Sequence, residues 1–220
     1  MSEKHLKTLY PFLHRAGGEP GAPDPALLHS IAEKARASRE ANERFFAEQA
    51  SALLAAAHAM AEAYRRGGRL FAMGNGGSSC DAAHVAVEFQ HPVTTGRPAL
   101  AAINLAADIA MISAVGNDVG FEHVFVRQLV AQARRGDALI GISTSGNSPN
   151  LIAAFAKARE MGLATVGLAC GDGGRMKTSG LVEHCLVVPD ASIHRVQETH
   201  VSAYHIRWDL VHTLLGNEVR

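Results

Sequence analysis

The sequence lacks several features that indicate other classes of protein. Its 220 residues contain three cysteines, Cys80, Cys170 and Cys185, which form neither a Cys-x-x-Cys pair nor an even-numbered set. A disulfide framework is therefore excluded, and a reduced, cytoplasmic setting is expected. No apolar run approaches the roughly 18 residues of a membrane span, and the first residues form no apolar signal segment, so we expect no membrane partner.

An excess of charge of one sign is missing as well, because 21 Lys and Arg balance 21 Asp and Glu. No global positive field draws a nucleic acid, which is therefore not an expected partner. Two nucleotide-binding fingerprints are also missing. A Gly-x-Gly-x-x-Gly pattern from Gly74 would need glycine at position 79, where the chain has Ser79, and no Gly-Lys-Ser/Thr follows.

Glycine and proline divide the chain. They are concentrated in residues 16–25, so we expect a leader with a linker over residues 1–25 and a single domain over residues 26–220. Residues 26–66 have apolar positions at helical spacing and predict one or two helices that end at Gly67-Gly68. A helix with more apolar surface than one sheet needs would pack against a partner subunit.

After Gly68, short apolar runs alternate with helix-like stretches, which is typical of a parallel sheet with helices on both faces. The predicted strands are 70–73, 99–103, 138–142, 164–168 and 184–188, and the predicted helices are 80–89, 121–134, 150–161 and 194–215.

The most informative stretch follows the third of these strands. Ile142-Ser-Thr-Ser-Gly-Asn-Ser148 places four hydroxyls before Pro149, which suits the first position of a helix. Such a turn offers hydroxyls and backbone N–H groups at a helix N-terminus, where the helix dipole favours an anion without any Lys or Arg.

A second turn of this kind, Gly74-Asn-Gly-Gly-Ser-Ser79, follows the first strand. Ligands of parallel sheets sit at the carboxyl ends of the strands, where both turns fall. Although either turn alone suits an ordinary surface loop, the pair predicts a small, phosphorylated, polyhydroxy ligand.

Two helices carry candidate metal ligands and proton carriers. His84 and Glu88 are four residues apart and share a helix face, while Gln197 and His205 lie about 80° apart on another helix. Two imidazoles, a carboxylate and an amide oxygen suit zinc or another borderline divalent metal. Ordinary surface histidines give the same spacing, and His200 and Glu198 are competing candidates.

The same groups suit an aldose–ketose isomerisation. A carboxylate removes the proton next to a carbonyl, and a histidine protonates the neighbouring atom. A metal would polarise the carbonyl and stabilise the enediolate.

With these residues in place, residues 50–215 resemble the sugar isomerase (SIS) domain proteins of the phosphoheptose isomerase family. The matching stretches are Gly74–His84, Val115–Asp118, Ile142–Ser148, Asp172–Gly174 and Arg195–His200 with His205. The resemblance implies a three-layer α/β fold with a five-stranded parallel sheet and an N-terminal helical segment. It also implies a homotetramer whose active sites lie at subunit interfaces.

The resemblance also implies roles for single residues. Glu88 would be the catalytic base and His205 the catalytic acid. The metal ligands, for zinc, would be His84, Glu88, Gln197 and His205. Residues in contact with the substrate would be Asn75, Gly76, Ser78, Asp118, Ser143, Thr144, Ser145, Ser148 and Gln197.

Two positions depart from the family pattern. His194 stands where the family usually has Asp, and His91-Pro92 where it usually has Gly-Arg. The expected reaction is D-sedoheptulose 7-phosphate to D-glycero-D-manno-heptose 7-phosphate, and these departures leave another sugar phosphate open. The alternatives are a non-catalytic sugar-phosphate regulator or scaffold similar to the DnaA initiator-associating protein, and a sugar-phosphate lyase or etherase.

Overall fold

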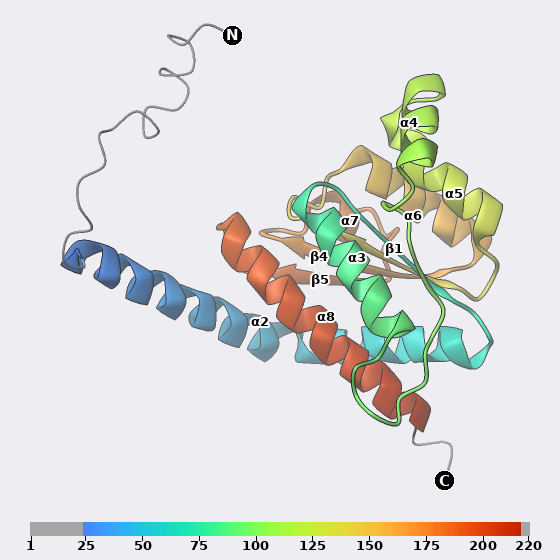
Figure 1. Cartoon of the computed structure of the whole chain (residues 1–220). Helices are drawn as coiled ribbons and strands as arrows, with labels where there is room; N and C mark the ends of the chain where they lie inside the picture. Colours follow the sequence, from blue (N-terminus) through green and yellow to red (C-terminus); the bar gives the residue numbers. More distant parts are fainter. Residues whose placement is uncertain (1–23, 217–220) are drawn as a thin grey trace, which may run out of the picture. The chain divides into compact units, whose positions relative to one another are not determined.

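The computed structural model describes residues 24–216 (Figure 1). The predicted leader and most of the linker, residues 1–23, lie outside this range. Helix α2 (Pro25–Arg65) is one continuous helix where the sequence left one or two open. The chain forms two compact units that divide within α2, after Arg36. The segment up to Arg36 exposes Leu27, Leu28 and Ile31, and all other elements belong to the second unit.

The second unit is built on a five-stranded sheet in which every strand pair is parallel, as predicted. The strands are β1 (Leu70–Gly74), β2 (Ala102–Asn104), β3 (Ala138–Ile142), β4 (Ala164–Cys170) and β5 (His184–Val188). Their order is β2-β1-β3-β4-β5, so the direction of winding reverses between β1 and β3. Gly74 pairs with Ile142 in register, and the loops that follow these two strands therefore start side by side.

Helices cover both faces of the sheet (Figure 1). One face carries α2 together with α3 (Gly77–Gln90) and α8 (Ile193–Gly216), and the other carries α4 (Ile109–Asp118), α5 (Val124–Gln132), α6 (Pro149–Met161) and the short α7 (Gly174–Thr178). Successive β1 residues face opposite cores: Leu70 and Ala72 point to the first layer, and Phe71 and Met73 to the second. Throughout residues 24–216, the helices are too short or too polar to cross a membrane.

Four elements differ clearly from the sequence prediction. Strand β2 starts at Ala102 instead of 99, because the Leu100 amide donates to the Phe89 carbonyl at the end of α3. Helix α4 was not predicted, although Asp108 caps it by accepting from the Met111 amide at 2.9 Å. The predicted helix 121–134 is a 3₁₀ turn (Phe121–His123) followed by α5, and α7 was missed.

Helices α3 and α8 run parallel with a constant offset. The Tyr204 hydroxyl is 2.9 Å from His84 Nδ1, and the Trp208 indole donates to the Glu88 carbonyl at 2.8 Å. At the start of α3, a side chain on Gly77 would come within 2.5 Å of the Gln197 amide nitrogen, so the Gln197 side chain lies directly against this glycine. Each contact joins residues 120 positions apart, which places α8 residues beside defined turns of α3.

His200 anchors α8 to the sheet and predicts an acid-sensitive fold. Its ring is buried, and Nε2 donates to the Ala169 carbonyl of β4 at 3.2 Å. Burial lowers the pKa of His200 from 6.5 to about 4. Between these values the unfolded chain binds a proton that the folded chain does not, so stability falls as the pH falls.

We expect His200 to lower the free energy of unfolding by about 3 kcal/mol as the pH falls from 6.5 to 4. In urea titrations over this range, the free energy of unfolding should fall less for His200→Gln than for the wild type. His58→Gln, at an exposed position, is the control. An equal pH dependence in wild type and His200→Gln would assign the acid sensitivity to other groups.

Candidate active site

A polar cavity lies where the winding of the sheet reverses. It has a volume of about 140 Å³ and is lined by Asn75, Ser78, Ile142, Ser143, Thr144, Ser145 and Ser148. The first two follow β1 and the others follow β3, so the cavity joins the two hydroxyl-rich turns at the carboxyl ends of neighbouring strands. Ligands of open α/β sheets bind at such a switch point.

Side-chain amides fasten the two turns to each other. Asn75 and Asn150 exchange two hydrogen bonds of 2.9 Å, and the Asn150 oxygen also accepts from the Leu151 amide in the first turn of α6. Asn150 is buried at the start of that helix, beside Pro149. The position of Asn75 is therefore set by a neighbouring loop as well as by its own.

The turn after β3 is held in a shape that exposes its hydroxyls. The Ser148 hydroxyl lies 3.0 Å from the Ser143 hydroxyl and does not cap α6. Gly146 has φ +64°, and a side chain there would meet the Gly173 carbonyl at 2.2 Å, so the turn requires glycine.

Among residues 24–216, no Lys or Arg lines this cavity, so hydroxyls and backbone groups would hold an anion there. The first turns of α3 and α6 both start at the cavity, with Ser78 in one and Ser148 at the N-cap of the other. Their dipoles and hydroxyl donors favour negative charge there. The geometry suits a phosphate group.

A second group of polar side chains lies further along α3. One ligand atom from each of His84, Glu88 and His205 lies within 4.8 Å of the other two. His84 Nε2 is 3.2 Å from a Glu88 oxygen, and the rings of His84 and His205 meet edge to face at 4.9 Å. The α3–α8 offset produces this cluster, because position 205 falls beside position 84.

Burial adjusts the charge of the groups around this cluster. Burial first and His84 second lower the pKa of His205, whereas Glu88 raises it. The imidazole is thus neutral at neutral pH, and it can bind a metal ion or donate its N–H. Burial raises the pKa of Asp81 to about 6, with His84 opposing, and one oxygen of this carboxyl has no hydrogen-bond partner. Burial also raises the pKa of Tyr204.

The donor set of the cluster fits a divalent metal ion. Two imidazoles and a carboxylate are ligands that zinc takes in catalytic sites, where a further position stays open for water or substrate. Two ligands at about 2 Å from one ion lie at most about 4 Å apart. The three side chains would therefore have to close in slightly from their present spread.

The structure places the other candidate residues elsewhere. The Gln197 amide lies against Gly77, seven residues and about 10 Å along α3 from His84, at the cavity end of the helix. Gly76 is the N-cap of α3, next to the cavity. Asp118 is exposed at the end of α4, where it accepts from the Asn117 side chain, and no residue of α4 lines the cavity.

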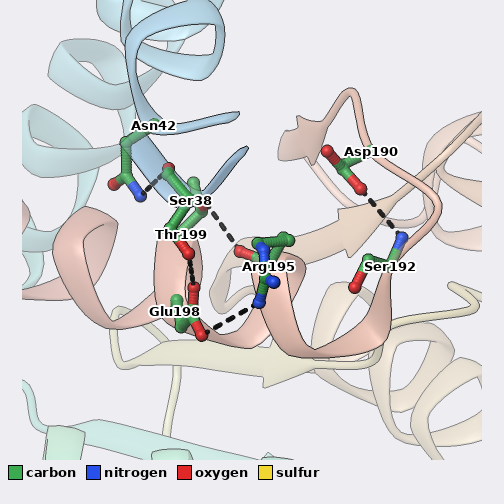
Figure 2. Close-up of polar contacts among 7 residues, drawn as sticks. All are labelled: Ser38, Asn42, Asp190, Ser192, Arg195, Glu198 and Thr199. Carbon is green, nitrogen blue, oxygen red and sulfur yellow. Dashed lines mark hydrogen bonds and ion pairs between the residues drawn. The ribbon is translucent and has the colours of Figure 1, made fainter. Parts of the chain in front are cut away.

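The two competing candidates have other contacts. Glu198 binds the Ser38 hydroxyl of α2 and the Arg195 guanidinium (Figure 2), and it lies about 10 Å before His205 along α8. The same view shows Asp190 accepting from the Ser192 amide just before α8 begins. His200 is directed at β4, as described above.

Two residues near the site were not among the candidates from the sequence. Asn150 sets the position of Asn75, and Tyr204 touches His84 from the neighbouring helix. Both depend on contacts between distant segments. A polar residue directly after Pro149 is a weak pointer to the first, and the offset between α3 and α8 identifies the second only once the helices are paired.

This chain is similar to known proteins over most of its length. The family described as SIS domain matches residues 35–170. A phosphoheptose isomerase of Desulfovibrio desulfuricans is 42% identical over 194 residues, which are 88% of this chain and 91% of that protein. The solved structure of a phosphoheptose isomerase from Francisella tularensis has a TM-score of 0.79 at 31% identity, covering 84% of this chain and 98% of its own.

A chain in a HobA–DnaA complex from Helicobacter pylori is a more distant neighbour. It has a TM-score of 0.53 at 12% identity and covers 90% of this chain and 99% of its own. At that identity the likeness extends to the fold alone. The matches at 31% and 42% identity cover most of both partners. This chain belongs to the SIS domain family, among its phosphoheptose isomerases.

Proposed function

We propose that this protein is an aldose–ketose isomerase that interconverts D-sedoheptulose 7-phosphate and D-glycero-D-manno-heptose 7-phosphate. The observation that carries the proposal is the arrangement of two sites along α3. A phosphate cavity lies at its first turn and a His/Glu cluster about two turns further on. A sugar held by its phosphate at one end would present its carbonyl end at the other.

The residues of the cavity would bind and orient the substrate. Ser143, Ser145 and Ser148, with Thr144, would donate hydrogen bonds to the phosphate oxygens. Asn75, Gly76 and Ser78 would contact the sugar at the start of α3, and Gln197 is placed to do so beside Gly77. Asp118 lies at the end of α4 and does not line the cavity, so α4 would have to move toward the sugar for Asp118 to contact it.

The His/Glu cluster would transfer the proton. Glu88 would remove the proton from the carbon next to the carbonyl, and His205 would donate a proton to the neighbouring position of the enediol. Both side chains are partly buried, and the Trp208 indole holds the Glu88 backbone by a hydrogen bond to its carbonyl. The reaction redistributes hydrogen within one molecule and needs no redox cofactor.

Zinc is the metal that we propose for the cluster. His84, Glu88 and His205 would hold it, and Gln197 would join them only after moving from Gly77. When bound, the ion would polarise the carbonyl and stabilise negative charge on its oxygen.

A homotetramer with shared active sites is the proposed assembly. Apolar side chains next to the cluster, Val87 at 51% and Ile206 at 42% exposure, stand unburied on α3 and α8. A second copy of the chain that covers them would also exclude water from Glu88 and His205. Light scattering of the purified protein measures this directly, and a monomer at micromolar concentration would contradict it.

Two positions that depart from the family pattern, 194 and 91–92, bear on which sugar is the substrate. His194 is exposed in the first turn of α8, and His91 is exposed at the C-cap of α3. Neither lines the phosphate cavity. Their departures from the family pattern would therefore change contacts to the sugar and leave phosphate binding unaltered, which keeps a different ketose phosphate as the alternative substrate.

The test is incubation of the purified protein with a panel of ketose phosphates, with zinc and after removal of metal by a chelator. We expect the aldose product from the seven-carbon substrate and loss of turnover on chelation, restored by zinc. Binding of sugar phosphates without conversion of any of them would support the scaffold alternative instead.

Ser145→Ala is expected to raise KM about 10-fold or more with little change in kcat. A hydrogen bond to a charged group contributes about 1.5–3 kcal/mol, and the phosphate is bound equally before and during proton transfer. Steady-state kinetics measure both constants. The exposed Ser113→Ala, on α4, is the matched control, and an unchanged KM for Ser145→Ala would place the anion elsewhere.

A further inference from the structure

Tyr204 contacts both histidines of the cluster and is buried, at 2% exposure. Its ring meets the rings of His84 and His205 edge to face, at 5.4 Å and 4.9 Å. Its hydroxyl lies 2.9 Å from His84 Nδ1. The opposite ring nitrogen of His84 faces Glu88, so the two nitrogens have separate partners.

This arrangement leaves Nε2 of His84 for a metal ion and gives Nδ1 to the residue that orients the ring. A histidine that binds a metal through one ring nitrogen needs a partner for the other, which fixes the tautomer and the orientation of the ring. The Nδ1 position is occupied by Tyr204, which leaves Nε2 directed at Glu88 and the rest of the cluster.

A hydroxyl suits this place better than a fixed donor or acceptor. Without metal, the Nε2–H of His84 would donate to Glu88, and Nδ1 would accept from the phenol. With Nε2 bound to a metal ion, the proton must sit on Nδ1, which would then donate to the phenol oxygen. A tyrosine hydroxyl can donate or accept, so it can serve both tautomers without moving.

We propose that Tyr204 is a positioning residue that holds His84 through Nδ1 and so sets Nε2 as its metal-binding nitrogen. The inference rests on the proposed metal site and adds to it a residue outside the ligand set. Removal of the hydroxyl leaves the ring contacts in place, and the loss is therefore confined to the orientation of His84.

The test compares two deletions of a phenol oxygen that has one hydrogen-bond partner. Tyr204→Phe removes the partner of His84. Tyr64→Phe is the matched control, because that hydroxyl donates to the Ala101 carbonyl at 3.2 Å and its ring packs on Phe89, outside the cluster. Metal-free protein is titrated with Zn²⁺ in competition with a chromophoric chelator, and thermal unfolding is recorded for each variant.

We expect Tyr204→Phe to weaken zinc binding by about 10- to 100-fold, the usual effect of losing such a partner, while Tyr64→Phe binds as the wild type does. Nitrogen-15 NMR of the wild type should show His84 as the Nε2–H tautomer without metal and as the Nδ1–H tautomer with zinc bound. These readouts do not depend on turnover.

Equal zinc affinity in Tyr204→Phe and the wild type, with His84→Ala impaired, would overturn the role of Tyr204 and leave the metal site standing. Zinc affinity that is the same in His84→Ala and the wild type would overturn both. An equal loss in Tyr204→Phe and Tyr64→Phe would also contradict the proposal, because it would show a general effect of lost packing.

Discussion

Glu88→Gln is expected to reduce kcat by about 10²-fold or more while the protein stays folded. The amide has the size of the carboxylate but cannot accept a proton at neutral pH, and a positioned general base commonly contributes 10²- to 10⁴-fold. The substrate phosphate is held in the cavity at the first turn of α3, so KM should change little. Measurement of kcat and KM on the seven-carbon ketose phosphate, with zinc present, checks both expectations.

Glu198→Gln is the matched control, because sequence periodicity alone allowed Glu198 as a candidate. Its carboxylate contacts Ser38 and Arg195 rather than the cluster (Figure 2). We expect turnover within a few-fold of the wild type, with at most a small loss of thermal stability. A larger loss of kcat in Glu198→Gln than in Glu88→Gln would move the catalytic base from α3 to the start of α8.

Those parts of the fold that depend on local pattern could be predicted from the sequence. Strands β3 and β5 have the predicted bounds, because each is a mostly apolar run with polar residues or proline on both sides: Asp137 and Ser143 around β3, Glu183 and Pro189 around β5. The two hydroxyl-rich turns were predicted to meet, and the in-register pairing of Gly74 with Ile142 brings them together in one cavity.

The missed elements have physical reasons. Helix α4 buries a single residue, Val115, so it has little of the apolar periodicity that predicts a helix. Its cap, Asp108, was the available signal. Strand β2 is short and lies at the sheet edge, where the start of pairing depends on which group binds the Leu100 amide. That contact comes from α3, which no local window includes.

In the candidate site, too, local spacing was predictable and contacts between helices were not. The spacing of His84 and Glu88 along one helix was enough to pair them, since positions four apart share a face. Positions 197 and 205 are eight apart, which fixes their angle around α8 but also separates them by about 12 Å along it. Gln197 therefore lies beside Gly77 while His205 lies beside His84. Which turn of α3 each of the two residues meets depends on how α8 pairs with α3, and spacing within α8 alone does not give that pairing.

His205→Gln is expected to lower kcat by about 10²-fold or more, because the amide cannot deliver a proton to the enediol as an imidazole does. Burial and His84 hold the pKa of His205 below its ordinary value, so the wild-type ring is neutral at neutral pH. The substitution also removes one of three clustered ligand groups, and zinc affinity should fall with turnover.

Excess zinc separates these two effects in His205→Gln. If His205 is the catalytic acid, saturation with zinc restores metal occupancy but leaves kcat depressed. Recovery of wild-type kcat at saturating zinc would reduce His205 to a ligand. His200→Gln controls for a histidine lost from the same helix, since His200 contacts the Ala169 carbonyl and lies outside the cluster. At neutral pH, where that ring is uncharged, its variant should keep turnover near that of the wild type.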